Sequence, residues 1–303
     1  MVLKSNHINI SVPAKIHLLG EHAVVYGKPA LLHSVELRVK VSISPSSKPC
    51  RLKISKIIEP IIKKEYNIKE IPKFKLVIDS KIPVGSGLGS SAAVSAACIA
   101  AILSILKISW DRNSVNKLAF EAEKVFHGNP SGGDNAAVVF GGLIWFQKIN
   151  RDEKIIKHLP FSIPEKLAQN FVLINTGKPV ESTAEMVKLA RITDFFLQDQ
   201  EKLTNELAEV IKNGDEKNFI RIIKQGEKNL ESIGVVSEIV QLIIREIENA
   251  GGAAKISGGG GRTKGVGMLL TYHKDPEIIK KIAKKRKFPF FQTELGVEGL
   301  RRE

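Results

Sequence analysis

The sequence predicts an α+β protein built from two domains. Strand-like stretches rich in β-branched residues alternate with helical patterns in the first half, whereas the second half is mostly helical with a few short strands. The 303 residues are enough for two domains of ordinary size. A composition shift near Pro160–Pro164 gives the expected boundary, which divides the chain into residues 1–162 and 163–303.

In the first half, three helices are expected between strands. Isoleucines recur on one stripe of the helix expected over Arg51–Tyr66. An Ala-rich run that starts at Gly89–Ser91 and ends near Lys107 predicts a central, closely packed helix. A third helix is expected from Ser114, the predicted N-cap, to His127. The expected strands are Ile8–Val12, Val35–Ser44, Lys73–Asp79 and Val138–Gln147.

The second half is predicted to be helical from Glu181 to Asn249, with breaks near Gly214 and Gly234. Short strands are expected at Asn170–Asn175, Ala253–Ser257 and Val266–Thr271, and the last two flank a run of glycines. A small sheet covered by many helices is the arrangement that this pattern favours.

Composition limits the classes of partner. The net charge of +14 suits anionic ligands such as nucleotides, but the basic residues are scattered and aromatic residues make up only 6%. The one dense basic run, Lys280–Lys287, suits a solvated helix face about as well as a phosphate track. Because basic and aromatic residues are not interleaved, no nucleic acid partner is expected. The longest apolar stretch, Ala92–Leu106, is too short to span a membrane. Residues 1–7 lack the apolar core of a signal peptide, and two cysteines make no disulfide framework, so a cytoplasmic protein is expected.

The first chemical motif is the glycine-rich segment Pro83–Ala93, which lies between an expected strand and helix. Glycine allows the backbone to approach a ligand closely, and the free N–H groups at a helix start form an anion site. The segment lacks the lysine of a P-loop, and its third glycine comes one position too early for a dinucleotide fingerprint. A glycine-rich turn before a tightly packed helix remains the structural alternative.

The second motif runs from Glu121 to Asp134. Glu121 and Glu123 flank the apolar stripe of the expected helix on opposite sides, and periodicity cannot choose which one faces a cleft and binds a cation. Asp134 follows a Gly-rich loop and is expected just before a strand, where it is a candidate base or metal ligand. An Asp that bonds to its own backbone in a turn is the alternative.

Two further motifs complete the set. Lys15, Glu21 and His22 lie among apolar residues just after the first expected strand, where a salt bridge and a satisfied histidine are the alternatives to catalysis. The run Gly258–Gly261, followed by Arg262-Thr263-Lys264, suggests close approach to a substrate or a flexible hairpin tip.

Together these motifs resemble the GHMP kinases and, within them, the mevalonate kinases. The similarity is carried, in order, by PAKIHLLGEHAVVYGKPA, PVGSGLGSSAAVSAA, HGNPSGGDNAAVVFGG and NTGKPVESTAEMV. The resemblance implies a ribosomal protein S5 domain 2-like N-terminal domain, a ferredoxin-like C-terminal domain, and ATP bound between them. It implies phosphorylation of the 5-hydroxyl of mevalonate by ATP with Mg²⁺. Another small-molecule kinase of the superfamily, such as a phosphomevalonate or sugar kinase, is the alternative, and a homodimer is a possible assembly.

The resemblance also implies roles for individual residues. Asp134 matches the catalytic base and Lys15 the lysine beside it, and Ser91 and Glu123 match the Mg²⁺ ligands. Glu21, His22, Ser131 and Thr183 fall where mevalonate kinases contact the substrate or order its site. Nucleotide-contacting positions match Ser80, Gly85, Ser86, Gly87, Leu88, Gly89, Ser90 and Ser91.

Two departures from the family pattern stand out. Gly133 replaces the usual aliphatic residue before the Asp and is expected to loosen the placement of Asp134. Arg262-Thr263-Lys264 follows the glycine run where a small residue or Cys is usual, and contact with phosphate or altered substrate choice are the expected consequences.

Overall fold

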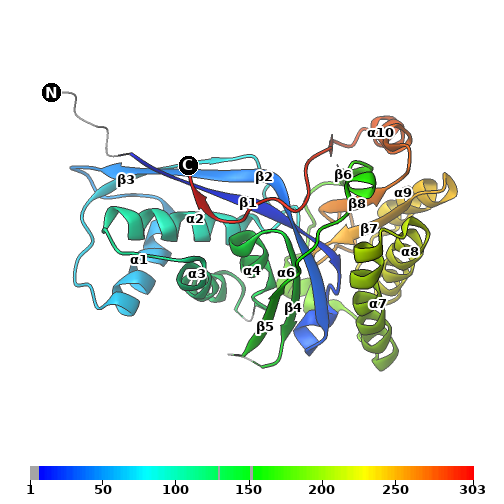
Figure 1. The fold of residues 1–303 in the computed structure, drawn as a ribbon, viewed down its shortest axis with the longest axis horizontal. Coiled ribbons are helices and arrows are strands. Elements are labelled where there is room, and N and C mark those ends of the chain that lie inside the picture. The colour runs from blue at the N-terminus through cyan, green and yellow to red at the C-terminus, as the bar shows by residue number, and fades with distance from the viewer. Residues whose placement is uncertain (1–6, 129, 151–152) are drawn as a thin grey trace.

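The computed structural model describes residues 7–128, 130–150 and 153–303. It shows two β-sheets, each covered by its own helices (Figure 1). Residues 1–6, on which most of the expectation about a signal peptide rests, lie outside the described residues. The mixed α+β architecture expected from the sequence is confirmed.

The first sheet has six antiparallel strands in the order β10-β1-β2-β4-β5, with β3 also pairing with β2. The long ladder between β1 and β2 runs from Ile8, opposite Ile43, to Leu19, opposite Leu31. The strands are β1 (Ile8–Leu19), β2 (Pro29–Pro45), β3 (Phe74–Ser80), β4 (Leu143–Lys148), β5 (Lys154–His158) and β10 (Arg301–Arg302).

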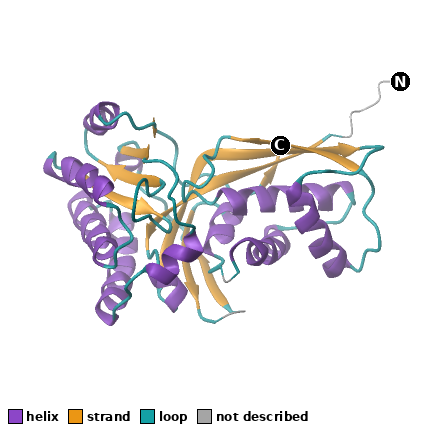
Figure 2. Cartoon of the chain, turned by 180° about the vertical axis from the view of Figure 1, so that it is seen from behind, coloured by secondary structure: helices purple, strands orange, loops and turns teal. Residues whose placement is uncertain are grey.

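Helices cover one face of this sheet (Figures 1 and 2). They are α1 (Lys53–Tyr66), α2 (Ser90–Ile105), α3 (Arg112–His127) and α4 (Gly133–Phe140). Helix α2 is apolar on all sides because it packs on β1 and β2 and is itself covered by α1 and α3. Its small Ala side chains are buried and permit this close approach.

The second sheet has the order β7-β8-β6-β9. Its strands are β6 (Phe171–Asn175), β7 (Ala253–Ser257), β8 (Met268–Tyr272) and β9 (Phe290–Phe291). The breaks expected near Gly214 and Gly234 separate three long helices. The helices of this half are α5 (Glu165–Ala168), α6 (Thr183–Leu189), α7 (Asp194–Asn213), α8 (Glu216–Ser232), α9 (Glu238–Asn249) and α10 (Pro276–Lys285).

The two halves meet where the C-terminal part of β1 contacts β7 and α8. A short 3-10 helix, η1 (Ala23–Tyr26), follows β1 and contacts α7. Ten consecutive residues at the end of β1 are buried, because the strand is covered on both faces there. The chain finally returns to the first sheet, where β10 pairs with β1.

Several expected boundaries were wrong. Asp111, and not Ser114, is the N-cap of α3, and the two residues form a reciprocal capping box with Ser114 at the third helical position. The strand expected from Val138 begins only at Leu143, because Val138 belongs to α4. A short buried helix and a buried strand both appear as an apolar run, so periodicity could not separate them. The first strand also continues past Val12, so Lys15 lies inside β1.

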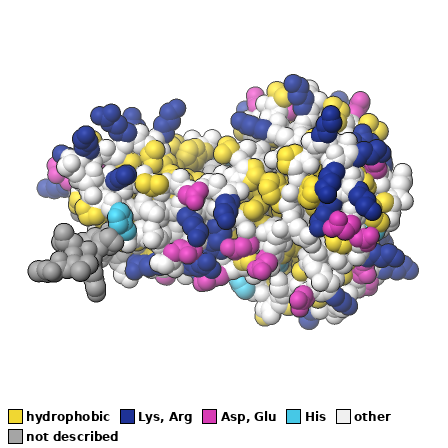
Figure 3. Space-filling view, turned by 90° about the horizontal axis from the view of Figure 1, so that it is seen from above, with side chains coloured by type: hydrophobic (Ala, Val, Ile, Leu, Met, Phe, Trp, Pro, Cys, Tyr) yellow, Lys and Arg dark blue, Asp and Glu magenta, His cyan; other side chains and the backbone are white. Residues whose placement is uncertain are grey.

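The helices and one face of the surface bear on membrane spans and on the distribution of charge. Among the described residues, no helix is long and apolar enough to cross a membrane. On the face in Figure 3, lysine and arginine side chains are spread among acidic and apolar ones and form no continuous basic track. In α10, part of the basic run pairs with acidic residues, as in the ion pairs of Lys280 with Glu277 and of Lys285 with Glu246.

Candidate active site

Lys15 of β1 and Asp134 of α4 form an ion pair. Nζ of Lys15 lies 3.1 Å from Oδ1 of Asp134, and it also donates to the carbonyl oxygen of Gly87 at 2.8 Å. The lysine side chain is 1% exposed and the aspartate side chain 38%, so the pair is open on the aspartate side. Asp134 lies in the first turn of α4, and not in a loop before a strand as expected.

Two β-bulges in β1 influence the direction of the Lys15 side chain. The register between β1 and β2 shifts between Pro13 and Ala14 and again between His17 and Leu19. Lys15 lies between these two bulges, which bend a strand and redirect its side chains. The backbone N–H of Lys15 also donates to the carbonyl oxygen of Leu88, which ties the strand to the glycine-rich loop.

The glycine-rich loop lies between β3 and α2 and is built from close backbone contacts. Gly87 has φ +79°, and a Cβ there would lie 2.0 Å from the carbonyl oxygen of Ser257 in the second half of the chain. Gly89 has φ +72°, and a Cβ there would lie 2.9 Å from Cγ of Lys15. Only glycine fits both conditions at these positions. The loop ends at Gly89, the N-cap of α2, where the free N–H groups of the helix favour binding of an anion.

Glu123 is the acidic residue that α3 directs inward. Its side chain is 4% exposed, whereas Glu121 is 45% exposed and pairs with Lys124 on the surface. Burial is the main cause that raises the pKa of Glu123 to about 7, and the nearby charge of Asp134 raises it further. Its Oε1 has no hydrogen-bond partner among the described residues, while Oε2 lies 3.5 Å from Nε2 of His127.

Ser91 lies next to this carboxylate, on the first turn of α2. A side-chain hydrogen bond from Ser91 lowers the pKa of Glu123 in part, and Oγ of Ser91 is 3.4 Å from Nε2 of His127. A buried carboxylate oxygen without a partner, beside a hydroxyl, is a donor set that suits a hard cation such as Mg²⁺. The residues present therefore fit the metal that the resemblance implies.

A buried ionic cluster lies where the end of β1 meets β7. Lys255 of β7 forms an ion pair with Oε1 of Glu21 and donates to the carbonyl oxygen of His17 at 3.3 Å. Burial nevertheless raises the pKa of Glu21, and its Oε2 has no hydrogen-bond partner among the described residues. Glu227 of α8 accepts from the N–H of Ile256 at 2.9 Å, and burial raises its pKa well above the ordinary value.

His22 forms a hydrogen bond to the glycine run 258–261 in the second half of the chain. Its Nε2 lies 3.0 Å from the carbonyl oxygen of Gly259, so Nε2 carries the proton of this hydrogen bond. Burial lowers the pKa of His22. Its backbone has φ +59°, an uncommon value outside glycine, which turns the chain from β1 into η1.

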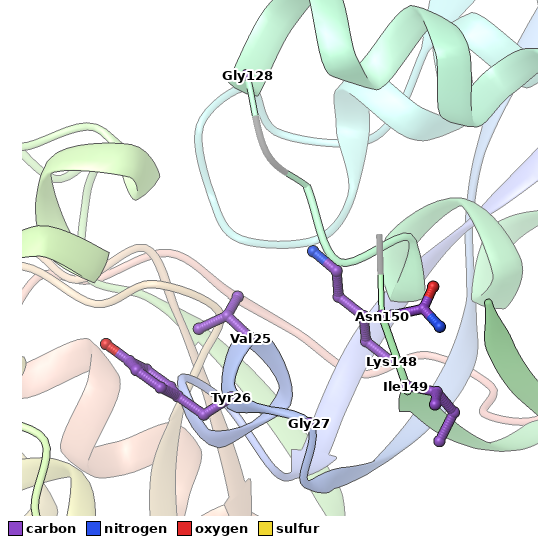
Figure 4. Close-up of a pocket in the computed structure, with 7 residues that line it drawn as sticks. All are labelled: Val25, Tyr26, Gly27, Gly128, Lys148, Ile149 and Asn150. Atoms are coloured by element: carbon purple, nitrogen blue, oxygen red, sulfur yellow. The ribbon is translucent and has the colours of Figure 1, made fainter. Parts of the chain in front are cut away.

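A cavity of about 570 Å³ is lined by residues from both halves of the chain. Ser131 lines it from the loop before α4, and Thr183 lines it from the first turn of α6. Of the predicted site residues, Lys15, Glu21, His22, Gly87, Glu123, Ser131, Asp134 and Thr183 line this cavity. Beside it lies a more open cavity of about 480 Å³, shown in Figure 4, and Val25 and Gly128 line both.

The remaining predicted nucleotide positions do not line this cavity. Ser80 lies at the end of β3, where its Oγ accepts from the N–H of Ile82 at 3.2 Å. Ser86 donates to the carbonyl oxygen of Pro83 at 2.7 Å, so its hydroxyl shapes the turn. Gly85, Ser86, Leu88, Gly89, Ser90 and Ser91 follow one another along the loop and the start of α2.

The two departures from the family pattern have structural explanations. A Cβ at Gly133 would lie 3.1 Å from Cδ1 of Leu32 and 3.4 Å from Cδ1 of Phe146, so these side chains already fill the space of the usual aliphatic residue. Arg262 donates to the carbonyl oxygens of Gly234 and Leu189. Its guanidinium therefore fastens the glycine run to two neighbouring segments of the second half.

Three residues of the site region were missed in the sequence. His17 and His127 line the cavity, and Lys255 forms an ion pair with Glu21, which lines it too. The alternation of β1 places residues 15 and 17 on the same face, which was the available signal for His17. No sequence signal marked Lys255, because its partner Glu21 is 234 positions away.

Comparison with known proteins agrees with this geometry. Residues 53–142 match the family model described as the GHMP kinases N terminal domain. The chain is 32% identical to the mevalonate kinase of Archaeoglobus fulgidus, over 83% of this chain and 88% of that protein. It is 28% identical to the mevalonate kinase of Pyrococcus abyssi, over 97% of each chain.

A solved structure shows the same fold. The mevalonate kinase of Methanococcus jannaschii superposes with a TM-score of 0.79 at 22% identity, covering 97% of this chain and 99% of that one. The two-domain fold expected from the motifs is thus confirmed, and Lys15, Asp134 and the glycine-rich loop lie together within it. The chain belongs to the mevalonate kinase family of GHMP kinases.

Proposed function

We propose that this protein transfers the γ-phosphoryl group of ATP to the 5-hydroxyl of mevalonate, giving 5-phosphomevalonate and ADP. The observation that carries the proposal is the Lys15–Asp134 pair, which opens onto a cavity beside the glycine-rich loop. Family membership supports the choice of mevalonate over a phosphomevalonate or sugar substrate.

Asp134 acts as the base in this reaction. Its carboxylate accepts the proton of the 5-hydroxyl while a bond forms between that oxygen and the γ-phosphorus. The bond from the γ-phosphorus to the bridging oxygen breaks, and ADP leaves with the electron pair. The Asp134 side chain is 38% exposed, and the residue lines the cavity in which the alcohol would bind.

Lys15 stabilises the charge that moves during transfer. Its buried ammonium lies within hydrogen-bond reach of Asp134, where the alkoxide develops, and of the loop that would hold the phosphates. The N–H groups of residues 85–91 and the N-terminus of α2 would bind the triphosphate. The neighbouring Ser80 is proposed to contact the nucleotide as well. Most of the rate would come from positioning and electrostatics.

Ser91 and Glu123 would hold Mg²⁺ together with the nucleotide phosphates. The described residues contain no group of three or more His, Cys, Asp and Glu side chains that could hold a metal ion. A bound Mg²⁺ neutralises charge on the β- and γ-phosphates. Glu21, His22, Ser131 and Thr183 are proposed to bind mevalonate or order its site.

Three broader features belong to the same proposal. The N-terminal domain comprises residues 1–162 and the C-terminal domain 163–303, with the final strand β10 returning to the first sheet. The protein acts in the cytoplasm, and it forms a homodimer, which size-exclusion chromatography with light scattering would test.

The decisive variants are Asp134→Asn and Lys15→Met. Both should keep the folded circular dichroism spectrum and lose about a thousandfold or more in kcat, because each removes a charge on which the transition state of transfer depends. Phosphorus NMR of the products should show ADP and a phosphomonoester with the wild type alone. Turnover near the wild-type rate in either variant would refute the assigned roles.

A further inference from the structure

His17 lies beside Lys15 in the wall of the candidate active site. The two residues are two positions apart in β1, so their side chains point to the same face of the strand. Nδ1 of His17 is 3.0 Å from Nζ of Lys15, and His17 is one of the residues that line the cavity. The His17 backbone is fixed as well, because its N–H donates to Oγ of Ser257 at 3.0 Å.

The chemistry of the contact fixes the tautomer of the ring. An ammonium group can only donate, so Nδ1 of His17 must accept the hydrogen bond and the ring proton lies on Nε2. Burial lowers the pKa of His17 well below its ordinary value, and the charges of Lys15 and Lys255 lower it further. The ring is therefore neutral at neutral pH.

The ammonium of Lys15 has three protons and three acceptors. These acceptors are the carbonyl oxygen of Gly87 at 2.8 Å, Nδ1 of His17 at 3.0 Å and Oδ1 of Asp134 at 3.1 Å. Two of them are neutral, so they hold the ammonium in place without cancelling its charge. The full positive charge then acts on Asp134 and on a phosphoryl group in transit.

The second ring nitrogen of His17 is the one left for a ligand. Nε2 makes no hydrogen bond to a described residue. It is not fully enclosed, however, whereas Nδ1 of His22 is both buried and without a partner among the described residues. Because His17 lines the cavity, its Nε2–H is a donor that a molecule in the cavity can use. A substrate with hydroxyl and carboxylate oxygens offers acceptors for this group.

We infer that His17 is a positioning residue that acts through Lys15, and that its Nε2–H donates a hydrogen bond to an oxygen of the bound alcohol substrate. This role rests on the proposed function, since it assumes phosphoryl transfer from ATP to an alcohol in this cavity. An aliphatic residue at position 17 would supply neither interaction.

Three substitutions separate the two contacts. His17→Asn places an acceptor near the position of Nδ1, and His17→Gln places a donor near that of Nε2, whereas His17→Leu provides neither. We expect His17→Asn to keep kcat within about threefold and to raise KM for mevalonate. We expect His17→Gln to keep KM and to lower kcat about 10- to 100-fold, the range for one hydrogen bond to a charged group.

His17→Leu should show both losses, with KM for ATP unchanged. The inference is overturned if His17→Leu keeps both kcat and KM for mevalonate. It is also overturned if all three variants lose kcat equally, because equal losses indicate packing and not hydrogen bonding.

A measurement without turnover keeps the inference separate from the proposed function. In nitrogen-detected NMR of the imidazole rings, the signal that His17→Asn removes should show the neutral tautomer with hydrogen on Nε2. That signal should shift in Lys15→Met. A wild type that fails to phosphorylate mevalonate but shows this tautomer would refute the substrate and keep the Lys15 contact, whereas hydrogen on Nδ1 would overturn the contact itself.

Discussion

Replacing Glu123 by Gln should make the ligand-free protein more stable above pH 7. The folded state buries this carboxyl group and leaves Oε1 without a partner among the described residues, so its pKa is about 7 against an ordinary value of 4.5. Between these values the folded protein holds more protons than the unfolded chain. The free energy of unfolding of the wild type therefore falls as pH rises from 4.5 through 7.

The size of the effect follows from the two pKa values. At 1.36 kcal/mol per pKa unit, the difference between about 7 and 4.5 corresponds to roughly 3 kcal/mol. Glutamine has the shape of the protonated carboxyl group and does not ionise. Glu123→Gln should thus match the wild type near pH 4.5 and exceed its stability by roughly 3 kcal/mol at pH 8.

Urea unfolding followed by tryptophan fluorescence provides the assay. The only two tryptophans, Trp110 and Trp145, lie in the same half of the chain as Glu123 and report its unfolding. Glu121→Gln is the matched control, because Glu121 is exposed on the same helix and should show no such divergence. Stability curves of Glu123→Gln and the wild type that stay parallel from pH 4.5 to 8 would refute the reasoning.

Three further substitutions test other parts of the account. Gly87→Ala should cost at least about 1–2 kcal/mol in urea unfolding and raise KM for ATP, because its Cβ would meet the carbonyl oxygen of Ser257 in a positive-φ conformation. Lys255→Met should cost about 3–5 kcal/mol in the same assay by leaving the Glu21 carboxylate buried without its partner, and adding Glu21→Gln should recover part of the loss. Arg262→Ala should lower stability by about 1–3 kcal/mol and leave steady-state kcat and KM unchanged, because its guanidinium holds backbone carbonyl groups. Wild-type stability in any of the three, or a large change of KM in Arg262→Ala, would contradict these assignments.

Local patterns predicted most of the helices well. The Ala-rich helix α2 and the breaks at Gly214 and Gly234 were foreseen, because periodicity and glycine act within a few residues. The short helix α4 was read as a strand, since a buried apolar run has no distinguishing period. The cap of α3 was misplaced by three residues, because Asp111 and Ser114 are both good capping residues.

In the candidate site, too, features within short segments could be predicted, whereas contacts between distant segments could not. The glycine-rich loop and Asp134 stood out because their chemistry is concentrated in short segments. Periodicity could not choose between Glu121 and Glu123, and burial in the folded protein distinguishes them. The alternation of residues 15 and 17 was the available signal for the contact of His17 with Lys15, but the expected strand ended at Val12 and so left both residues out. The contact of Lys255 with Glu21 joins residues 234 positions apart, so no local spacing could predict it.

The most direct test of the central claim is the release of ADP from Mg-ATP by the purified protein. Mevalonate should be offered beside phosphomevalonate, galactose and homoserine at equal concentrations. The account predicts turnover that depends on mevalonate, with the other three alcohols at the background rate. Turnover on one of the others with none on mevalonate would contradict the proposed substrate.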